Sequence, residues 1–546
     1  MTIHGTHFSV LGVCSPGTTV TMGYWNQYGS SAQLAMNVQI ISDSTITAVA
    51  PASMAGVVDV MVSNRCGNSP VNAPADQLTY ADPNLHLCPS VGACTVTIDG
   101  THALGAASSV ALGLLHGIYP APSSGDPGQW VDGLLSPLKV KYWRVVSVTS
   151  PDAGIQHDYD VAAHFGSKFI YMVSDDWYQN KGMSVQPYDN IDNGVYYAFV
   201  KQLVEKLHSA GKPVDYWDVQ NEPAGGTPGD WMRVYETAWH AIRDATAEIQ
   251  RTDASYPIQR IEGPSLASYR DKPYACCLDL TTFLDYTLSH HVIYDALSWH
   301  EINDLFPAEQ YRLDSPKFAS DHITRARTLI ASRPGLGNPK LFVNEYSPGD
   351  SHLIPGWQVG FISAFEASNV DEASRACWIV GLTQECKMGF DGLLTGDDQH
   401  PQAAYWVYRA YAQMVGERVA VSSPADDISA FATRLQTATS LNVLLGRHVN
   451  CGQPPRPNRN VTNMPPDTCP ENTSSHARAA NIDLSINVPF GLTSIHVTAQ
   501  RIPNARGAMS SLPAAFTPSF TFSGGVAHVH LTNVADGDAY AVSVGP

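Results

Sequence analysis

Two short apolar stretches of the chain each end in an Asn-Glu pair. Residues 214–220 form a β-branched and aromatic run that stops at an Asn-Glu-Pro sequence containing Glu222, and residues 340–343 stop at an Asn-Glu pair containing Glu345. Pro223 cannot extend a sheet and biases Glu222 away from helix, so both glutamates are predicted at the C-terminal ends of strands. Two carboxyl groups that meet at such an edge can flank a glycosidic bond and hydrolyse it.

The surroundings of the two glutamates predict different roles for them. An apolar wall or a neighbouring negative charge raises the pKa of a carboxyl group, which suits a general acid. Glu222 has Trp217 and Pro223 nearby in sequence. We therefore expect Glu222 to be the acid/base and Glu345 the nucleophile; the alternative is that both are ordinary loop carboxylates.

Other residues near the predicted strand ends are candidates for substrate binding. Asn221 is predicted to hydrogen-bond a sugar 2-hydroxyl, although it could instead cap a turn. Arg144 is predicted to keep the nucleophile ionised through a charge-assisted bond, or else to form an ion pair in a barrel core. The remaining candidates, each of which also has a packing or capping interpretation, are His116, His300, Tyr346, Trp177, Trp217, Trp299 and Asp176 with its neighbour Asp175.

The composition describes an acidic chain with ample material for buried cores. Of 546 residues, 44% are hydrophobic, and 50 acids against 32 bases give a formal net charge of −18. Nucleic acid is therefore not expected as a partner, because phosphate binding needs a clustered basic face. No apolar run approaches membrane-spanning length. No metal or cofactor is expected, because no cluster has a ligand spacing and no Gly-rich nucleotide loop follows the first predicted strand.

Residues 110–416 alternate strand, loop and helix, as a (β/α)8 barrel does. Amphipathic stretches are clearest at Val195–Ala210, Trp231–Ile249, Leu280–Ser289 and Ile323–Ser332, and the last barrel helix is expected at Gln402–Val415. The eight candidate strands are Ala111–Ile118, Val140–Ser147, Lys168–Ser174, Val214–Gln220, Arg260–Glu262, Ala296–Trp299, Leu341–Asn344 and Ala376–Gly381.

The segments that flank the barrel are predicted to be β-rich. Residues 1–82 contain short alternating runs separated by Gly, Pro, Ser and Asn, and residues 417–546 are again rich in Val, Thr and Ser, so each is expected to form a β-sandwich. Residues 83–109 are interpreted as a linker and a lead-in to the barrel.

The ten cysteines predict disulfides and an oxidising compartment, hence a secreted protein. The chain starts Met-Thr-Ile-His-Gly, without the basic and apolar segments of a secretory signal, so a signal removed beforehand is expected. Sequence alone does not fix the connectivity, and Cys276 and Cys277 could pair with each other, pair elsewhere or stay free. The other cysteines fall in neighbouring pairs: Cys14 and Cys66, Cys88 and Cys94, Cys377 and Cys386, Cys451 and Cys469.

Several motifs occur in an order known from one group of enzymes. They are Asn221-Glu222-Pro223, Glu262-Gly263-Pro264, Ser298-Trp299-His300, Asn344-Glu345, and downstream Gly392–Asp397 with Ala404–Ala412. In this order they resemble the clan A retaining glycoside hydrolases, and family 39 most closely. The resemblance implies Glu222 as acid/base, Glu345 as nucleophile, and substrates of the β-xylosidase, α-L-arabinofuranosidase or iduronidase type. Gln220 and Glu301 depart from the family pattern, so the resemblance does not choose the sugar.

The first domain has a resemblance of its own. Thr2–Phe8, Gly17–Val20, Ala50-Pro51 and Gly56–Ser63 resemble the IPT/TIG immunoglobulin-like domain. That resemblance implies either a carbohydrate-binding or docking module, or a spacer that stabilises the catalytic unit.

Three functions stay open on the sequence. The first is a secreted, retaining exo-glycosidase acting on plant or microbial polysaccharides, and the second is an endo-acting hydrolase with an open groove. Long loops at 264–280, 302–318 and 347–357 favour a closed site and hence exo action. The third is a non-catalytic carbohydrate-binding protein, which would need neither Glu222 nor Glu345. The oligomeric state is left open.

Overall fold

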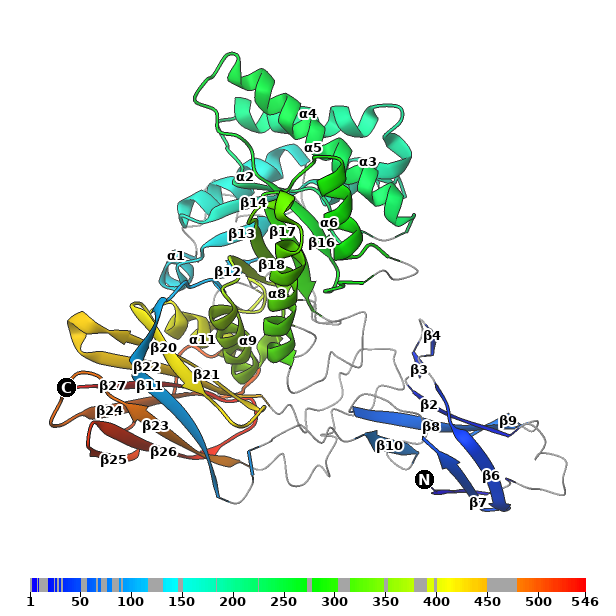
Figure 1. Ribbon diagram of the computed structural model, residues 1–546. Coiled ribbons are helices and arrows are strands. Elements are labelled where there is room, and N and C mark those ends of the chain that lie inside the picture. The colour runs from blue at the N-terminus through cyan, green and yellow to red at the C-terminus, as the bar shows by residue number, and fades with distance from the viewer. Residues whose placement is uncertain are drawn as a thin grey trace.

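The computed structural model places three units along the chain (Figure 1). A small β-unit at the N-terminus is followed by one strand of a large β-sheet, then by a barrel, and then by the rest of that sheet. The structure describes the chain except for residues 1, 7, 9–17, 24, 27–28, 31–32, 51–55, 65–66, 70–75, 81–87, 90–91, 116–130, 146–150, 183, 224, 273–276, 303–314, 348–351, 378–389, 397–399 and 449–478.

Eight parallel strands close into a barrel, so the predicted (β/α)8 fold is confirmed. Helices alternate with the strands and cover the outside of the barrel (Figure 1). In order, the strands are β12 (Gly113–Leu114), β13 (Tyr142–Val145), β14 (Lys168–Met172), β15 (Tyr216–Asp218), β16 (Ile261–Leu266), β17 (Ala296–Glu301), β18 (Lys340–Tyr346) and β19 (Glu372–Arg375). The main helices between and after them are α2 (Pro151–His164), α3 (Val173–Lys181), α4 (Val195–Ser209), α5 (Pro228–Gln250), α6 (Leu280–Ser289), α8 (Ser315–Ala331), α9 (Pro355–Ser368) and α11 (Ala403–Tyr411).

Helix α5 illustrates how local sequence produces these elements. Thr227 caps the helix: its side chain accepts a hydrogen bond from the Asp230 backbone, and the Asp230 side chain accepts one from the Thr227 backbone. Pro228 occupies the first helical position, where its missing N–H does no harm. Trp231, Tyr235 and later residues at helical spacing are buried, so the apolar face packs on the barrel.

The eighth strand lies earlier than the sequence predicts. The apolar run Ala376–Gly381 was expected to form it, whereas β19 spans Glu372–Arg375. That expectation is wrong because β19 is largely polar: Glu372, Ser374 and Arg375 are all fully buried. Ser374 donates to Glu372, and Arg375 donates to Gln358 of α9 and to the carbonyl of Asp391. A search for apolar runs passes over such a strand and selects the next one.

Nine strands form the sheet of the C-terminal unit, and it folds over so that its inward side chains share one apolar core. This agrees with the predicted β-sandwich. Residues 83–109 were expected to form a linker and a lead-in to the barrel, but residues 93–106 form an interior strand of this sheet, so that part of the prediction is wrong. In spatial order the strands are β24 (His496–Ile502), β27 (Ala539–Gly545), β22 (Ser440–Arg447), β21 (Ile428–Leu435), β20 (Glu417–Ser422), β11 (Ala93–Ala106), β23 (Ala480–Asn487), β26 (Val526–Val534) and β25 (Ser519–Ser523).

Strand β11 begins beside a disulfide. Cys88 and Cys94 are bonded to each other, which confirms that predicted pair. Cys277 and Cys377 are also disulfide-bonded. The remaining predicted cysteines, Cys14, Cys66, Cys276, Cys386, Cys451 and Cys469, lie outside the described residues.

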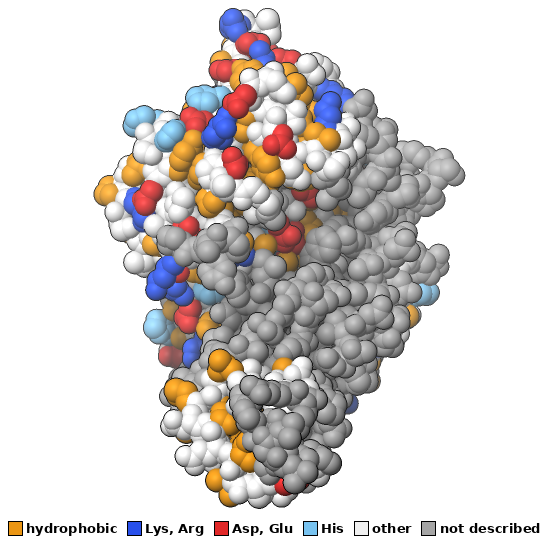
Figure 2. Space-filling model, turned by 90° about the vertical axis from the view of Figure 1, so that its right-hand side faces the viewer, with side chains coloured by type: hydrophobic (Ala, Val, Ile, Leu, Met, Phe, Trp, Pro, Cys, Tyr) orange, Lys and Arg blue, Asp and Glu red, His pale blue; other side chains and the backbone are white. Residues whose placement is uncertain are grey.

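In the N-terminal unit, two of the described sheets enclose a core that includes Val20, Ile46 and Val62, and β3 (Trp25–Asn26) pairs with β4 (Gly29–Ser30) as a separate small sheet. Apolar side chains also gather on its surface, at the bottom of the view in Figure 2; Leu34, Met36 and Ile41 are among the exposed ones. One sheet contains β1 (Thr2–His4), β7 (Thr45–Val49) and β6 (Met36–Ser42); the other contains β10 (Gln77–Tyr80), β8 (Gly56–Asn64), β2 (Thr19–Gly23) and β5 (Gln33–Leu34). Among the described helices of the whole chain, none is long and apolar enough to span a membrane.

The barrel and the C-terminal sandwich meet through backbone packed on backbone. Helix α9 lies against β21 and β22, and the Gly356 N–H donates to the Gly537 carbonyl at 2.8 Å. A Cβ on Gly356 would overlap the backbone carbonyl of Arg447, and a Cβ on Gly446 would overlap the backbone of Gly356. Only glycine permits this approach at either position, so any larger residue there must move α9 and β22 apart.

We predict that Gly356→Ala destabilises the protein by about 1–3 kcal/mol, because the added methyl group forces the two units apart. Thermal unfolding followed by calorimetry measures the effect. Gly133 in α1 (Asp132–Leu135) is a matched control, since nothing lies within 4 Å of a Cβ added there. Equal melting temperatures for the two variants would contradict the close packing of α9.

Candidate active site

The two predicted glutamates lie together at the C-terminal end of the barrel strands. Glu222 follows β15, and Glu345 is in β18. One carboxylate oxygen of each and a ring nitrogen of His300 all lie within 4.8 Å of one another. The Glu222 side chain is 42% exposed, whereas that of Glu345 is 1% exposed. Residues far apart in sequence thus form one constellation of two carboxyl groups and an imidazole.

The backbone at Glu222 is held in an uncommon conformation. Its φ is +46°, in the left-handed region, which costs a residue with a Cβ about 1–2 kcal/mol. The Glu222 N–H donates to the carbonyl of Ser265 at 2.9 Å, and Ser265 also has a positive φ of 48°. This hydrogen bond joins the ends of β15 and β16 and so fixes the direction of the Glu222 side chain.

Arg144 in β13 connects the site across the inside of the barrel. Its Nη1 donates to Glu345 Oε1 at 2.7 Å, its Nε to Asp218 Oδ2 at 2.8 Å, and its Nη2 to Asn221 Oδ1 at 2.8 Å. Burial disfavours its charged form, but the charges of Asp218 and Glu345 outweigh that effect and raise the pKa of Arg144. The predicted partner of Arg144, Glu345, is therefore in direct contact with a permanent cation.

His300 lies between the two glutamates. Its Nδ1 is 3.0 Å from Glu222 Oε1, and its Nε2 is 3.6 Å from Glu345 Oε1. Complete burial lowers the pKa of His300 to about 4, although the charge of Glu345 opposes this. The imidazole is consequently neutral near neutral pH, and it orients Glu222 without adding charge.

Burial by the surrounding protein raises the pKa of Glu222 above its ordinary value, while the charges of Arg144 and Arg270 oppose the shift. The carboxyl group that is predicted to act as the acid therefore holds its proton to a higher pH than a free glutamic acid does.

Asn221 is oriented from both sides. Its Oδ1 accepts from Arg144, and its Nδ2 donates to Asp175 Oδ2 at 3.3 Å. Asp175 lies in the first turn of α3, directly after β14. Asp175 and Asp176 were both predicted either to bind sugar hydroxyls or to cap the next helix. Asp176 is 1% exposed and contacts Tyr171 and Asn180, so its predicted role in substrate binding is wrong. Asp175 contacts Asn221 instead, because successive residues of a helix point about 100° apart.

Beneath the glutamates, the barrel interior holds a layer of buried acids that the sequence analysis did not single out. Asn344 Nδ2 donates to Glu262 Oε1 at 2.7 Å and to Ser265 Oγ at 2.8 Å, and Ser265 Oγ donates to Asp218 Oδ1 at 2.6 Å. Burial raises the pKa of Asp218 to about 6, that of Glu372 to about 8, and that of Glu262 well above its usual range. Polar residues at alternate positions inside otherwise apolar strands were the signal that could have found this layer.

We predict that Glu372→Gln flattens the pH dependence of stability. The folded-state pKa of about 8 exceeds the ordinary value of 4.5, so the folded protein keeps a proton that the unfolded chain loses within this window. Wild-type stability should then fall, relative to the variant, by up to about 1.4 kcal/mol per unit as pH rises from 5 to 8. Denaturant unfolding at both pH values measures this. Parallel pH dependence of the two proteins would contradict a protonated, buried Glu372.

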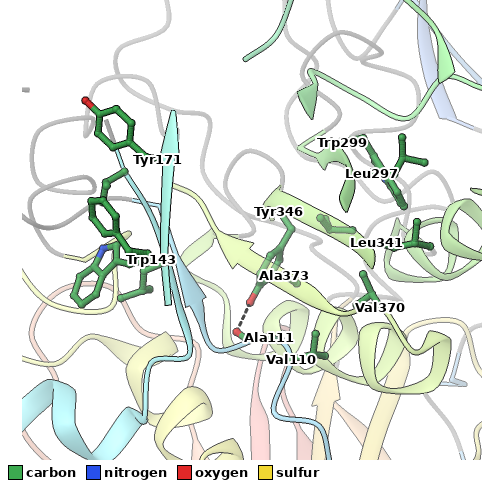
Figure 3. Close-up of a cluster of buried hydrophobic side chains, with 14 of the residues drawn as sticks. Val110, Ala111, Trp143, Tyr171, Leu297, Trp299, Leu341, Tyr346, Val370 and Ala373 are labelled. Carbon is green, nitrogen blue, oxygen red and sulfur yellow. Dashed lines mark hydrogen bonds between the residues drawn. The ribbon is translucent and has the colours of Figure 1, made fainter. Parts of the chain in front are cut away.

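The predicted aromatic sugar platforms are wrong. Trp177, Trp217 and Trp299 are fully buried members of the hydrophobic core between barrel and helices. Figure 3 shows Trp299 among apolar side chains of this core. The indole N–H of each is bonded within the protein: to the Val185 carbonyl, to Gln259 and to Glu301, respectively. Trp217 and Trp299 are strand residues that point outward from the barrel, because side chains alternate in direction along a strand. Trp177 lies in helix α3, where its ring contacts Tyr196 and Phe199.

Tyr346 also packs away from the glutamates. It is fully buried, and its hydroxyl lies 3.1 Å from the carbonyl of Ala111, to which it donates (Figure 3). Its predicted role in substrate binding is therefore wrong, because it is the neighbour of Glu345 in sequence and so faces the opposite side of β18. His116, another predicted sugar ligand, lies outside the described residues.

Glu222, His300 and Glu345 could each offer one atom to a metal ion. The chemistry of the group does not fit this use well, because Arg144 already donates to Glu345 and its positive charge opposes a second cation there. Glu222 and Glu345 instead fit the predicted acid/base and nucleophile roles, with His300 in contact with Glu222, and we assign no metal to the three residues.

The fold and the paired strand-end glutamates define a class: (β/α)8 barrels with a two-carboxylate site and an attached β-sandwich. No protein-family model matches the chain, and no curated protein matches its sequence. Solved structures match the fold, each over 83% of this chain. They include N2152 from Neocallimastix frontalis (17% identity, TM-score 0.59, 100% of that chain), a glucosidase from Croceicoccus marinus (15%, 0.57, 99%) and an α-L-arabinofuranosidase from Thermotoga maritima (12%, 0.52, 100%).

Proposed function

We propose that the protein is a retaining glycoside hydrolase that removes terminal sugars from plant or microbial polysaccharides. The observation that carries the proposal is the approach of the Glu222 and Glu345 carboxylate oxygens to within 4.8 Å. Retaining enzymes hold their carboxyl groups about 5–5.5 Å apart, whereas inverting enzymes leave about 6.5–9.5 Å for a water molecule. The glycosidases among the solved structures with this fold support the same class.

The proposed reaction has two displacements. Glu345 attacks the anomeric carbon, the bond to the leaving oxygen breaks, and Glu222 gives that oxygen its proton. Water then attacks the same carbon, Glu222 takes the proton of the water, and the bond to Glu345 breaks.

The neighbours of the glutamates suit these steps. Arg144 donates to Glu345 and so favours the ionised form that the attack requires. Neutral His300 holds Glu222 in position at 3.0 Å. Asn221, whose amide is fixed by Arg144 and Asp175, has a second N–H that can donate to the sugar 2-hydroxyl.

The finer parts of the proposal rest on the sequence. The resemblance to family 39 implies a terminal sugar of the xylose, arabinose or iduronic acid type without choosing among them, and the long strand-end loops favour exo action. The Cys88–Cys94 disulfide supports secretion, because disulfides persist in oxidising compartments. The IPT/TIG resemblance favours an N-terminal module for carbohydrate binding or spacing.

We predict that azide restores activity to Glu222→Ala and Glu345→Ala and that the glycosyl azides formed by the two variants have opposite anomeric configurations. Glu222→Ala should lower kcat about 10²–10⁴-fold and yield a glycosyl azide of retained configuration, because azide then attacks the glycosyl-enzyme. Glu345→Ala should be inactive without azide and should yield the inverted product with it. NMR of the products from a panel of aryl xylosides, arabinosides, galactosides and glucosides gives both the sugar and the configuration.

Glu248→Ala is the matched control, because Glu248 lies on the outer face of α5 and pairs with Lys201. It should keep wild-type kinetics. An inverted wild-type product would refute the double displacement. Cleavage of polysaccharides but of no aryl glycoside would replace exo with endo action, and sugar binding without cleavage would leave a binding protein.

We predict that kcat/KM falls as pH rises through an apparent pKa above 4.5, the ordinary value for Glu222. The reason is that Glu222 must be protonated in the first step, and burial raises its pKa. With a dinitrophenyl glycoside, whose leaving group needs no proton, this limb should disappear in Glu222→Ala. Persistence of the limb in that variant would assign the acid to another group.

A further inference from the structure

Asp175 is a third carboxyl group at the mouth of the barrel that the two-step reaction does not use. Its Oδ1 accepts from the Ser174 hydroxyl at 3.3 Å, and its Oδ2 accepts from Asn221 Nδ2 at 3.3 Å. Unlike its neighbour Asp176, which is buried against Tyr171 and Asn180, Asp175 is only half-buried. A carboxylate has about four acceptor positions, so these two bonds leave capacity for a ligand.

The hydrogen bonds that Asn221 already makes limit how its amide can bind a sugar beside Asp175. The Asn221 carbonyl oxygen is occupied by Arg144, and one of its two N–H groups by Asp175. The amide can therefore act on a sugar only as a donor, through its second N–H. Asp175 Oδ2 lies 3.3 Å from Asn221 Nδ2, so a sugar hydroxyl adjacent to the one that accepts from Asn221 would lie near the Asp175 carboxylate.

We infer that Asp175 is a specificity-determining residue that accepts a hydrogen bond from the sugar 3-hydroxyl and so selects a neutral sugar with free 2- and 3-hydroxyl groups. The inference rests on the proposed function, because it assumes that Asn221 contacts the 2-hydroxyl of a sugar bound at Glu345. It adds the class of sugar that the site accepts, which the two glutamates do not specify.

The charges around Asp175 support a neutral sugar rather than a uronic acid. Asp175, Glu222 and Glu345 contribute carboxyl groups to the same site. Of the two arginines whose charges act on Glu222, Arg144 is engaged by Glu345 and Asp218, and Arg270 is the other cation, against three carboxyl groups. A substrate carboxylate would meet this acidic surface at short range, in surroundings where repulsion is poorly screened.

The surroundings of Asp175 also determine the pH at which it is ionised. Burial raises its pKa to about 6, Arg144 opposes the shift, and Glu345 adds to it. Above that pH, the ionised carboxylate is a strong acceptor for hydroxyl groups. Selectivity for the 3-hydroxyl should therefore weaken as pH falls through about 6, since the protonated acid accepts less well.

The test compares Asp175→Asn with the wild type on 4-nitrophenyl xylosides and arabinofuranosides and on their 3-deoxy counterparts. Wild type should prefer the 3-hydroxyl sugar about 10- to 100-fold in kcat/KM, as expected for one hydrogen bond to a charged group. In Asp175→Asn, this ratio should approach one. The substitution should also lower kcat/KM less for a 4-nitrophenyl glucuronide than for the neutral 3-hydroxyl sugars. An equal loss on both sugars would overturn the inference, because it would mean that Asp175 acts only by positioning Asn221.

Asp176→Asn is the matched control, since it removes the adjacent charge on the buried side of α3; it should keep the wild-type ratio. If Asp176→Asn changes the ratio as Asp175→Asn does, the change reflects a general disturbance of α3, and the inference is wrong. Calorimetric binding of the same sugars to Glu345→Gln separates the two proposals. Binding with the expected 3-hydroxyl preference, but no hydrolysis by wild type, would refute the hydrolase and keep the inference. No binding of either sugar would overturn the inference.

Discussion

A single buried cation, Arg144, organises the site. An unpaired guanidinium would be strongly disfavoured inside a barrel, so its neighbours must supply acceptors in the directions that its planar fork fixes. Glu345, Asp218 and Asn221 do so, at 2.7–2.8 Å. One side chain thereby sets the position of the proposed nucleophile Glu345, the orientation of the Asn221 amide that is proposed to bind sugar, and the charge of the layer below. Burial raises the pKa of Asp218, Glu262 and Glu372 in this layer. The charges of neighbouring acids add to the shift, and the single charge of Arg144 opposes it.

The C-terminal sandwich holds both ends of the barrel segment, because the strands before and after the barrel pair with each other. Strand β11 is completed before the barrel begins, and β20 follows the barrel directly and pairs with β11, with Ala106 opposite Glu417. The chain therefore enters and leaves the barrel at neighbouring points of one sheet. The glycine contact of α9 with β22 fixes the other side of the same interface. A barrel held in this way can keep strained positions such as Glu222, with its φ of +46°, in place.

Some features could be predicted because they depend on local patterns. The Asn-Glu pairs, the strand–helix alternation and helices α4 and α6 followed from turn residues and periodicity, and the structure agrees with them. The assignment of side chains to the inside or the outside of the barrel was less secure. Trp217 and Tyr346 were chosen for proximity in sequence to a glutamate, yet alternation along a strand directs them into the outer core.

The sequence by itself determined the barrel, the sandwich and the identity of the two glutamates, because strand ends, helix periodicity and paired carboxylates are local signals. Tertiary structure decided which of the polar candidates share the site. Arg144 comes from β13, His300 from β17 and Asp175 from the first turn of α3, and only closure of the barrel brings them to Asn221 and the glutamates. It also decided that residues 93–106 belong to the C-terminal sheet, since pairing between β11 and β23, almost 400 residues apart, is a long-range contact that no local pattern encodes.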